Sequence, residues 1–154
     1  MGDILKINFK KIIFIIIFTI IVGSFFALFT STNIYSEIVR PKFSPPGIVF
    51  PIVWFILYTL MGISFYIVTE EDNDLGNIKI YLLQLFVNSL WTLFFFGFKW
   101  FLFSFIWIII LIVLVIIMII KFYRANKVAG LLQIPYLIWL FIAAYLNLSI
   151  YLLN

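Results

Sequence analysis

The sequence contains no cysteine and no histidine, and only 10% of its 154 residues are charged. Without cysteine the chain has neither a disulfide framework nor thiolate chemistry. Without histidine it lacks the commonest metal ligand and the usual general base near neutral pH. We therefore predict no metal site and no bound cofactor.

Charged side chains are also missing from the middle of every long apolar run. Proton pumps, ion-coupled transporters and voltage sensors place such groups within the membrane, so their absence argues against these classes. It also removes the carboxylate pairs on which hydrolases depend. An interior site would have to work through aromatic rings, amides, hydroxyls and shape.

What the chain does have is apolar surface, since 66% of its residues are hydrophobic. A soluble domain of this length cannot bury so much, whereas a bilayer can solvate it. Five runs, uncharged apart from Lys79 at the mouth of the third, approach or exceed the roughly 20 residues that cross a hydrocarbon core. The first could instead be a signal peptide, although it is long for one and no A-x-A cleavage site follows. We predict an all-α membrane protein, a single five-transmembrane-helix bundle with spans at about 12–30, 48–68, 78–98, 101–120 and 128–153.

The positive charges lie in the segments that flank these runs and form no single basic face, which argues against nucleic-acid binding. Five crossings put the termini on opposite sides. Seven Lys or Arg residues fall on the N-terminal side and three on the other: Lys6, Lys10, Lys11, Lys79, Lys121, Arg124 and Lys127, against Arg40, Lys42 and Lys99. The positive-inside rule predicts an integral multi-pass protein with a cytoplasmic N-terminus and an external first loop.

The first loop, residues 31–47, is the longest connection and carries Pro41, Pro45 and Pro46. A proline-rich loop of this length is semi-rigid and often functional. The third connection, at Gly97 and Lys99, reads as a tight turn.

The first two predicted helices carry side chains at helical spacing. Pro51, Trp54 and Tyr58 share one face of the second helix, where they form either ordinary aromatic packing or one wall of an aromatic cavity. Gly23 and Ala27 on the first helix are a small-xxx-small pair, which usually indicates close helix contact.

The third predicted helix has the most polar stripe within the membrane: Gln84, Asn88, Trp91, Thr92 and Phe95. An amide that faced lipid would be costly, so the stripe must face other helices or a cavity. Its amides could form hydrogen bonds between helices or orient the polar edge of a ligand.

The fifth predicted helix carries Trp139, Ala143 and Asn147 on one face at spacings of four. The small Ala143 leaves room beside the indole, either for a neighbouring helix or for a ligand. Pro135 should bend or loosen the preceding turn.

Four ordered segments within residues 34–154 carry a resemblance. They are Arg40-Pro41-Lys42-Phe43-Ser44-Pro45-Pro46-Gly47; Pro51, Trp54, Leu57-Tyr58 and Met61-Gly62; Asn88, Trp91 and Phe94-Phe95; and Pro135-Tyr136-Leu137, Trp139, Ala143-Ala144 and Leu146-Asn147. Together they resemble the motifs of the TspO/MBR family, the translocator proteins or peripheral benzodiazepine receptors.

The chain departs from the family's pattern at three points. Phe43 replaces the usual loop tryptophan, and Ile34 stands where a tryptophan often precedes the loop tyrosine. No basic residue follows Lys127, so the family's cholesterol motif is absent and we do not predict cholesterol binding.

The resemblance implies a five-helix bundle with a ligand pocket closed by the first loop, and homodimers. It implies binding of tetrapyrroles such as protoporphyrin IX and of hydrophobic drugs, and in some members light-dependent breakdown of protoporphyrin, with Trp54 and Trp139 as the tentative catalytic residues. Aromatic faces suit a flat apolar porphyrin. Arg40 and Lys42 could pair with its propionates at the membrane surface.

We predict that these helical faces converge on one cavity beneath the first loop. The predicted ligand-binding residues are Tyr35, Arg40, Pro45, Pro46, Phe50, Trp54, Tyr58, Asn88, Trp91, Phe95, Trp139, Ala143 and Asn147. The expected partners are a tetrapyrrole or other hydrophobic small molecule, membrane lipid and a second copy of the chain. Three functions stay open: a receptor, sensor or translocator; a light-dependent porphyrin-degrading enzyme; and a structural membrane protein whose aromatics only pack.

Overall fold

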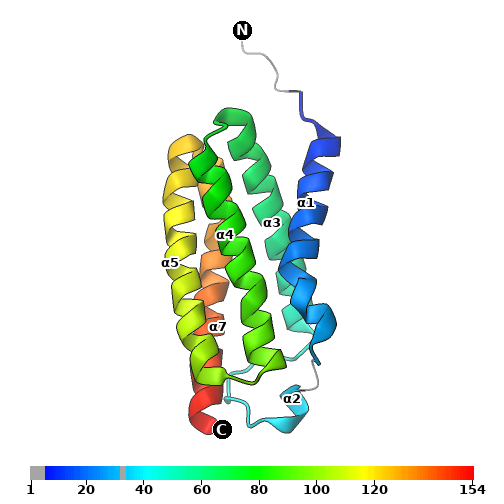
Figure 1. Ribbon diagram of the computed structural model, residues 1–154, viewed down its shortest axis with the longest axis vertical. Coiled ribbons are helices and arrows are strands. Elements are labelled where there is room, and N and C mark those ends of the chain that lie inside the picture. The colour runs from blue at the N-terminus through cyan, green and yellow to red at the C-terminus, as the bar shows by residue number, and fades with distance from the viewer. Residues whose placement is uncertain (1–5, 32–33) are drawn as a thin grey trace.

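A computed structural model describes residues 6–31 and 34–154, so residues 32–33 of the predicted first loop lie outside it. The described residues form helices joined by short turns, apart from the loop before α3 (Figure 1). The elements are α1 (Phe9–Ser24), η1 (Phe25–Phe29), α2 (Ile34–Glu37), α3 (Val49–Glu71), α4 (Leu75–Thr92), η2 (Leu93–Gly97), α5 (Phe101–Ala125), α6 (Lys127–Leu132) and α7 (Ile134–Leu153).

Within the described residues, five helical stretches are long and apolar enough to cross a membrane, which confirms the predicted all-α, five-helix architecture. Large apolar side chains such as Phe14, Phe55, Ile106 and Phe141 are exposed on the outer faces, where lipid would solvate them. The stretches are Phe9–Phe29, Val49–Glu71, Leu75–Gly97, Phe101–Ala125 and Lys127–Leu153.

The breaks between helices follow from local chemistry. The Asn126 side chain accepts hydrogen bonds from the backbone N–H groups of Val128 and Ala129, which caps the start of α6. Pro135 has no N–H to continue the helix, and it lies in the first turn of α7, just after the break at Gln133. The predicted loosening before Pro135 is therefore confirmed.

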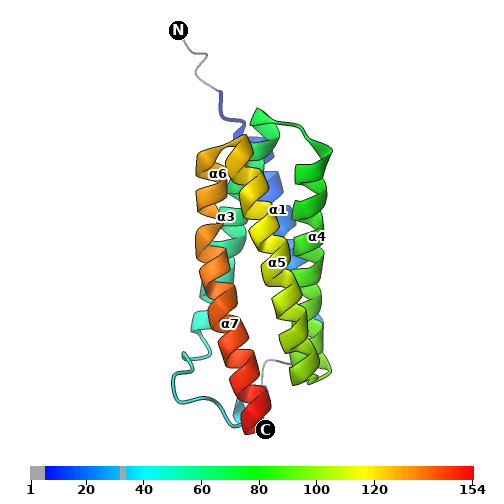
Figure 2. The same ribbon diagram turned by 90° about the vertical axis from the view of Figure 1, so that its left-hand side faces the viewer.

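Consecutive membrane-spanning stretches run antiparallel to one another (Figure 1). The start of α1 and the α3–α4 turn lie at one end of the bundle, and α2 and the C-terminus lie at the other (Figure 1). Figure 2 shows α6 leading into α7, which runs back along α5. A methyl group added at Gly62 of α3 would lie 2.9 Å from the Ile16 Cα, so the glycine allows α1 to pack directly on α3.

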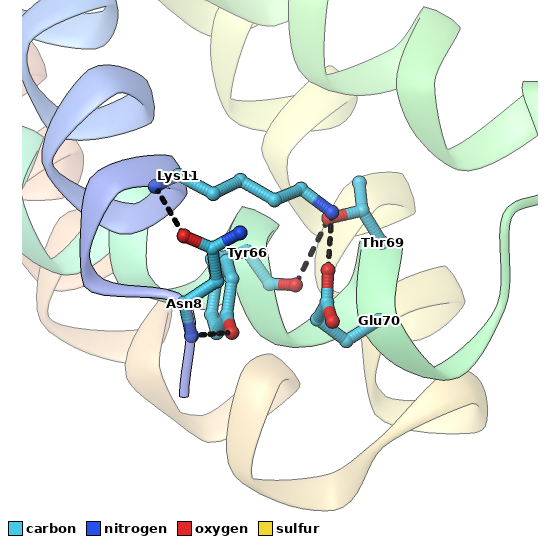
Figure 3. Close-up of polar contacts among 5 residues, drawn as sticks. All are labelled: Asn8, Lys11, Tyr66, Thr69 and Glu70. Carbon is cyan, nitrogen blue, oxygen red and sulfur yellow. Dashed lines mark hydrogen bonds and ion pairs between the residues drawn. The ribbon is translucent and has the colours of Figure 1, made fainter. Parts of the chain in front are cut away.

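Ion pairs tie the elements together at both ends of the bundle. Figure 3 shows the Lys11 ammonium of α1 paired with the Glu70 carboxylate of α3, and the backbone N–H of Asn8 donating to the Tyr66 hydroxyl at 2.9 Å. At the opposite end Lys99 pairs with Glu37 at 2.9 Å, which links the η2–α5 turn to α2. Lys99 has a φ of 56°, as expected of a residue in the tight turn predicted there.

Candidate functional site

The aromatic face of α3 points into the bundle. The Trp54 and Tyr58 rings stack with centroids 5.3 Å apart. The Tyr58 hydroxyl donates to the side-chain oxygen of Asn88 on α4 at 2.8 Å and also lies 3.0 Å from the Gly23 carbonyl oxygen on α1. Tyr58 therefore joins three helices.

The amides of α4 are engaged by protein groups. The Asn88 amide nitrogen donates to the Tyr136 hydroxyl of α7 at 2.8 Å, and that hydroxyl donates to the Gln84 side-chain oxygen at 2.9 Å. All three side chains are buried. The geometry thus supports the interhelical interpretation of Gln84 and Asn88, and Asn88 lines neither cavity described below.

Asn147 on α7 orients Trp91 on α4. Its side-chain oxygen accepts from the Trp91 indole N–H at 3.0 Å, and its amide nitrogen donates to the Phe101 carbonyl at 2.7 Å. Trp139 lies two turns earlier on the same face, and within the described part of the chain its buried indole nitrogen has no hydrogen-bond partner.

A small cavity, which we call the inner cavity, lies between α3, α4, α7 and α2. Its volume is about 20 Å³, close to the space that one water molecule needs. Eight of the predicted site residues line it together with two residues that the sequence analysis missed, Leu146 and Ile150. The lining is Tyr35, Phe50, Trp54, Trp91, Phe95, Trp139, Ala143, Leu146, Asn147 and Ile150. Ile150 could have been found, because it continues the spacing of Ala143 and Asn147.

A larger cavity, which we call the side cavity, lies between α1, α3 and α4. Its volume is about 550 Å³, within the roughly 300–1,000 Å³ range of small-molecule sites. Its lining is mostly apolar: Ile20, Gly23, Ser24, Ala27, Gly47, Ile48, Phe50, Pro51, Trp54, Phe55, Tyr58, Trp91, Thr92 and Phe96.

The α1 wall of the side cavity was missed because Gly23 and Ala27 were read as a helix contact. Gly23 does meet a neighbour: a methyl group added there would lie 2.4 Å from the Tyr58 ring. Ala27, one turn on, lines the side cavity and is exposed. The small pair therefore makes room for Tyr58 and for the cavity beside it.

Phe50, Trp54 and Trp91 line both cavities, so these three rings form a shared aromatic wall. Two adjacent rings of η2 divide between the two sides, because Phe95 lines the inner cavity and Phe96 the side cavity. The η2 turn is π-helical, a geometry that is frequent at functional sites.

The first loop covers the inner cavity with Tyr35. This ring stacks on Phe50 with centroids 5.3 Å apart and meets Phe96 edge-on at 5.7 Å. Burial raises the pKa of the Tyr35 hydroxyl to about 12, against the opposing effect of the nearby Arg40. Arg40 itself is exposed with its guanidinium 6.0 Å from the Tyr35 ring centre. Neither the inner cavity nor the side cavity is lined by Arg40, Pro45 or Pro46.

The sequence model of the TspO/MBR family matches residues 14–153, which is most of the chain. The chain belongs to the TspO/MBR family. It is 36% identical over 134 residues to the tryptophan-rich protein TspO of Archaeoglobus fulgidus, covering 86% of this chain and 87% of that one. It is 32% identical to the tryptophan-rich sensory protein of Cereibacter sphaeroides, with 83% of this chain and 81% of that one covered. It is 27% identical to the human translocator protein, with 84% of this chain and 80% of that one covered.

Two tryptophans of this TspO/MBR protein lie outside both cavities and serve as references. Trp100 is exposed at the start of α5, and its ring stacks on Phe94. Trp107 donates its indole N–H to the Val87 carbonyl at 2.8 Å. Among the described residues, no cluster of three acidic side chains that could hold a metal ion is present.

Proposed function

We propose that this TspO/MBR membrane protein is a receptor, sensor or translocator that binds a tetrapyrrole such as protoporphyrin, or another hydrophobic small molecule, within the helix bundle. The observation that carries the proposal is the shared wall of Phe50, Trp54 and Trp91 beside a cavity of about 550 Å³. Flat aromatic ligands stack favourably on such rings.

The polar end of a porphyrin also has a candidate partner. Arg40 is exposed at the end of the bundle that carries α2, and among the described residues it forms no ion pair. A guanidinium suits a propionate because it can form two parallel hydrogen bonds. The names of the relatives, a sensory protein and a translocator protein, agree with binding followed by signalling or movement.

The proposal is tested by titrating purified protein with protoporphyrin IX in the dark. Trp54→Phe should weaken binding by about 5- to 150-fold, since loss of a stacking indole removes roughly 1–3 kcal/mol of apolar contact. Trp100→Phe and Trp107→Phe are matched controls and should bind like the wild type. Equal affinity for folded Trp54→Phe and wild type would show that the wall only packs.

Two further variants decide which cavity is used. Trp139 and Ala143 line the inner cavity alone, so Trp139→Phe and Ala143→Leu weaken binding only if the ligand enters that cavity. Loss of binding in Trp54→Phe but not in these two variants would assign the ligand to the side cavity.

A second candidate function is light-dependent porphyrin degradation. The arrangement that favours it is a chain of oxidisable rings, in which Trp54 stacks on Tyr58 and meets Tyr136 edge-on at 6.2 Å. The same samples under light separate the two functions. Decay faster than that of free porphyrin in detergent supports the enzyme, and binding without decay supports the receptor.

The proposal includes a cytoplasmic N-terminus, for which the support is seven Lys and Arg residues on that side against three on the other. It also includes a homodimer, for which the support is the family resemblance alone.

A further inference from the structure

One end of the inner cavity is covered by Tyr35, which belongs to residues 34–46, the segment that we call the lid. Ile34 is buried, and Tyr35 contributes its ring to the cavity lining. At about 20 Å³ the closed cavity is far below the volume of ordinary ligand sites. A ligand of any size can reach Trp139 and Ala143 from this end only if the lid moves.

One side chain holds the middle of the lid by both of its backbone groups. The Asn154 side-chain oxygen accepts from the Val39 N–H at 3.0 Å, and its amide nitrogen donates to the Val39 carbonyl at 2.9 Å. The same nitrogen donates to the Ile150 carbonyl at 2.8 Å, which ties the side chain to the last turn of α7. Because both bonds go to Val39, they fix which lid residue meets the end of α7 and how far the lid lies from that end.

Asn154 continues the stripe of α7 that lines the inner cavity. Ala143, Asn147, Ile150 and Asn154 follow one another at spacings of four, three and four, and so share one helical face. The first three line the cavity, and the fourth holds its cover. A shift of α7 that widened the cavity would therefore also pull on the lid.

A second contact holds the start of the lid. Glu37 of α2 pairs with Lys99 in the η2–α5 turn at 2.9 Å, and both side chains are more than half exposed. An ion pair in this setting is weak and is screened by salt. Val39 and Glu37 are two residues apart, so the two contacts act on one short segment between Tyr35 and Arg40.

We propose that Asn154 and Lys99 form a two-point latch that keeps the lid closed over the inner cavity, and that its release controls ligand entry. As a control on entry the latch rests on the proposed function. The latch itself is a property of the closed structure and can be tested without a ligand.

The test uses the absence of cysteine from the chain. Ala143→Cys places a single thiol in the inner cavity, and its labelling rate with a small water-soluble methanethiosulfonate, in lipid vesicles, reports opening. Adding Asn154→Ala should raise the labelling rate about fourfold or more. Each of the two hydrogen bonds that it removes from the lid should change the equilibrium constant for lid opening by at least roughly twofold. Adding Lys99→Ala should raise the labelling rate by up to about fivefold.

Three controls sharpen the result. Tyr151→Phe alters an exposed hydroxyl on the same end of α7 and should leave the rate unchanged. About 1 M salt should reproduce part of the Lys99→Ala effect, because it screens the exposed pair. Ile150→Cys, also in the cavity lining, replaces the reporter if Ala143→Cys does not fold.

Equal labelling rates with and without Asn154→Ala, in either reporter, would overturn the latch. Protoporphyrin should slow labelling of the reporter, and it should bind faster in Asn154→Ala than in the wild type. If titration shows no porphyrin binding while Asn154→Ala still speeds labelling, the latch stands and the porphyrin function fails. If porphyrin binds but at the same rate in both proteins, the latch does not control entry.

Discussion

Trp91 and Asn147 meet side chain to side chain across α4 and α7, with the indole N–H donating to the amide oxygen at 3.0 Å. Because Trp91 belongs to the wall shared by both cavities, Asn147 is a positioning residue: both ends of its amide are used by the protein. The family motif that ends in Leu146-Asn147 thereby acquires a physical role.

Asn147→Leu should lower the free energy of unfolding by about 0.5–2 kcal/mol, because it leaves the Trp91 N–H and the Phe101 carbonyl without partners. It should also weaken porphyrin binding, since the Trp91 ring loses its fixed orientation. Both effects are measured by denaturant unfolding in detergent and by titration. Ser149→Ala, on another face of α7, is the control, and Asn147→Leu behaving like this control would contradict the assignment.

Gly23 and Gly47 both line the side cavity, and they form a matched pair. A Cβ at Gly23 would lie 2.4 Å from the Tyr58 ring, whereas nothing lies within 4 Å of one at Gly47. Gly23→Ala should displace Tyr58, which should lower the free energy of unfolding by about 1–3 kcal/mol and weaken porphyrin binding in the side cavity. Gly47→Ala should bind normally. The same affinity in both variants would mean that the ligand does not use the side cavity.

Free-base protoporphyrin should bind at least about as tightly as haem. Strong axial ligation of iron in proteins is usually provided by histidine, cysteine or methionine with histidine, and this chain has no histidine or cysteine. Parallel titrations with both ligands check this. A much tighter haem complex, with an absorbance spectrum typical of protein ligation, would refute it.

Alkaline pH should loosen the lid through Tyr35. Since burial raises the pKa of this hydroxyl to about 12, the folded state keeps its proton where the unfolded state, with a pKa near 10, has lost it. The contribution of Tyr35 to stability is therefore complete below about pH 10 and falls as the pH rises toward 12. Unfolding temperatures across this range should fall more steeply for wild type than for Tyr35→Phe. Parallel curves for the two proteins would show that Tyr35 is not linked to stability.

Reporter fusions test the orientation. A fusion after Asn154 should behave as non-cytoplasmic, because the distribution of positive charges predicts that the opposite end of the bundle faces the cytoplasm. Fluorescence from a reporter that folds only in the cytoplasm would reverse the assignment.

The sequence analysis identified the inward face of a helix where aromatic, polar or small residues recur at helical spacing. Trp54 and Tyr58 on α3, and Trp139 and Ala143 on α7, lie at helical spacing and line the cavities. It failed on α1 and η1, which are mostly apolar, because Gly23 and Ala27 were read as a helix contact although both line the side cavity. The size of each cavity depends on side-chain conformations across several helices, which spacing within one helix cannot specify.

The π-helical turn at Leu93–Gly97 has a consequence for which changes the protein can tolerate. Its hydrogen bonds span five residues instead of four, and its adjacent Phe95 and Phe96 line different cavities. Deleting a single residue there would rotate the following side chains by about 100° relative to α4. We expect this segment to accept many aromatic and aliphatic replacements while rejecting every change in length.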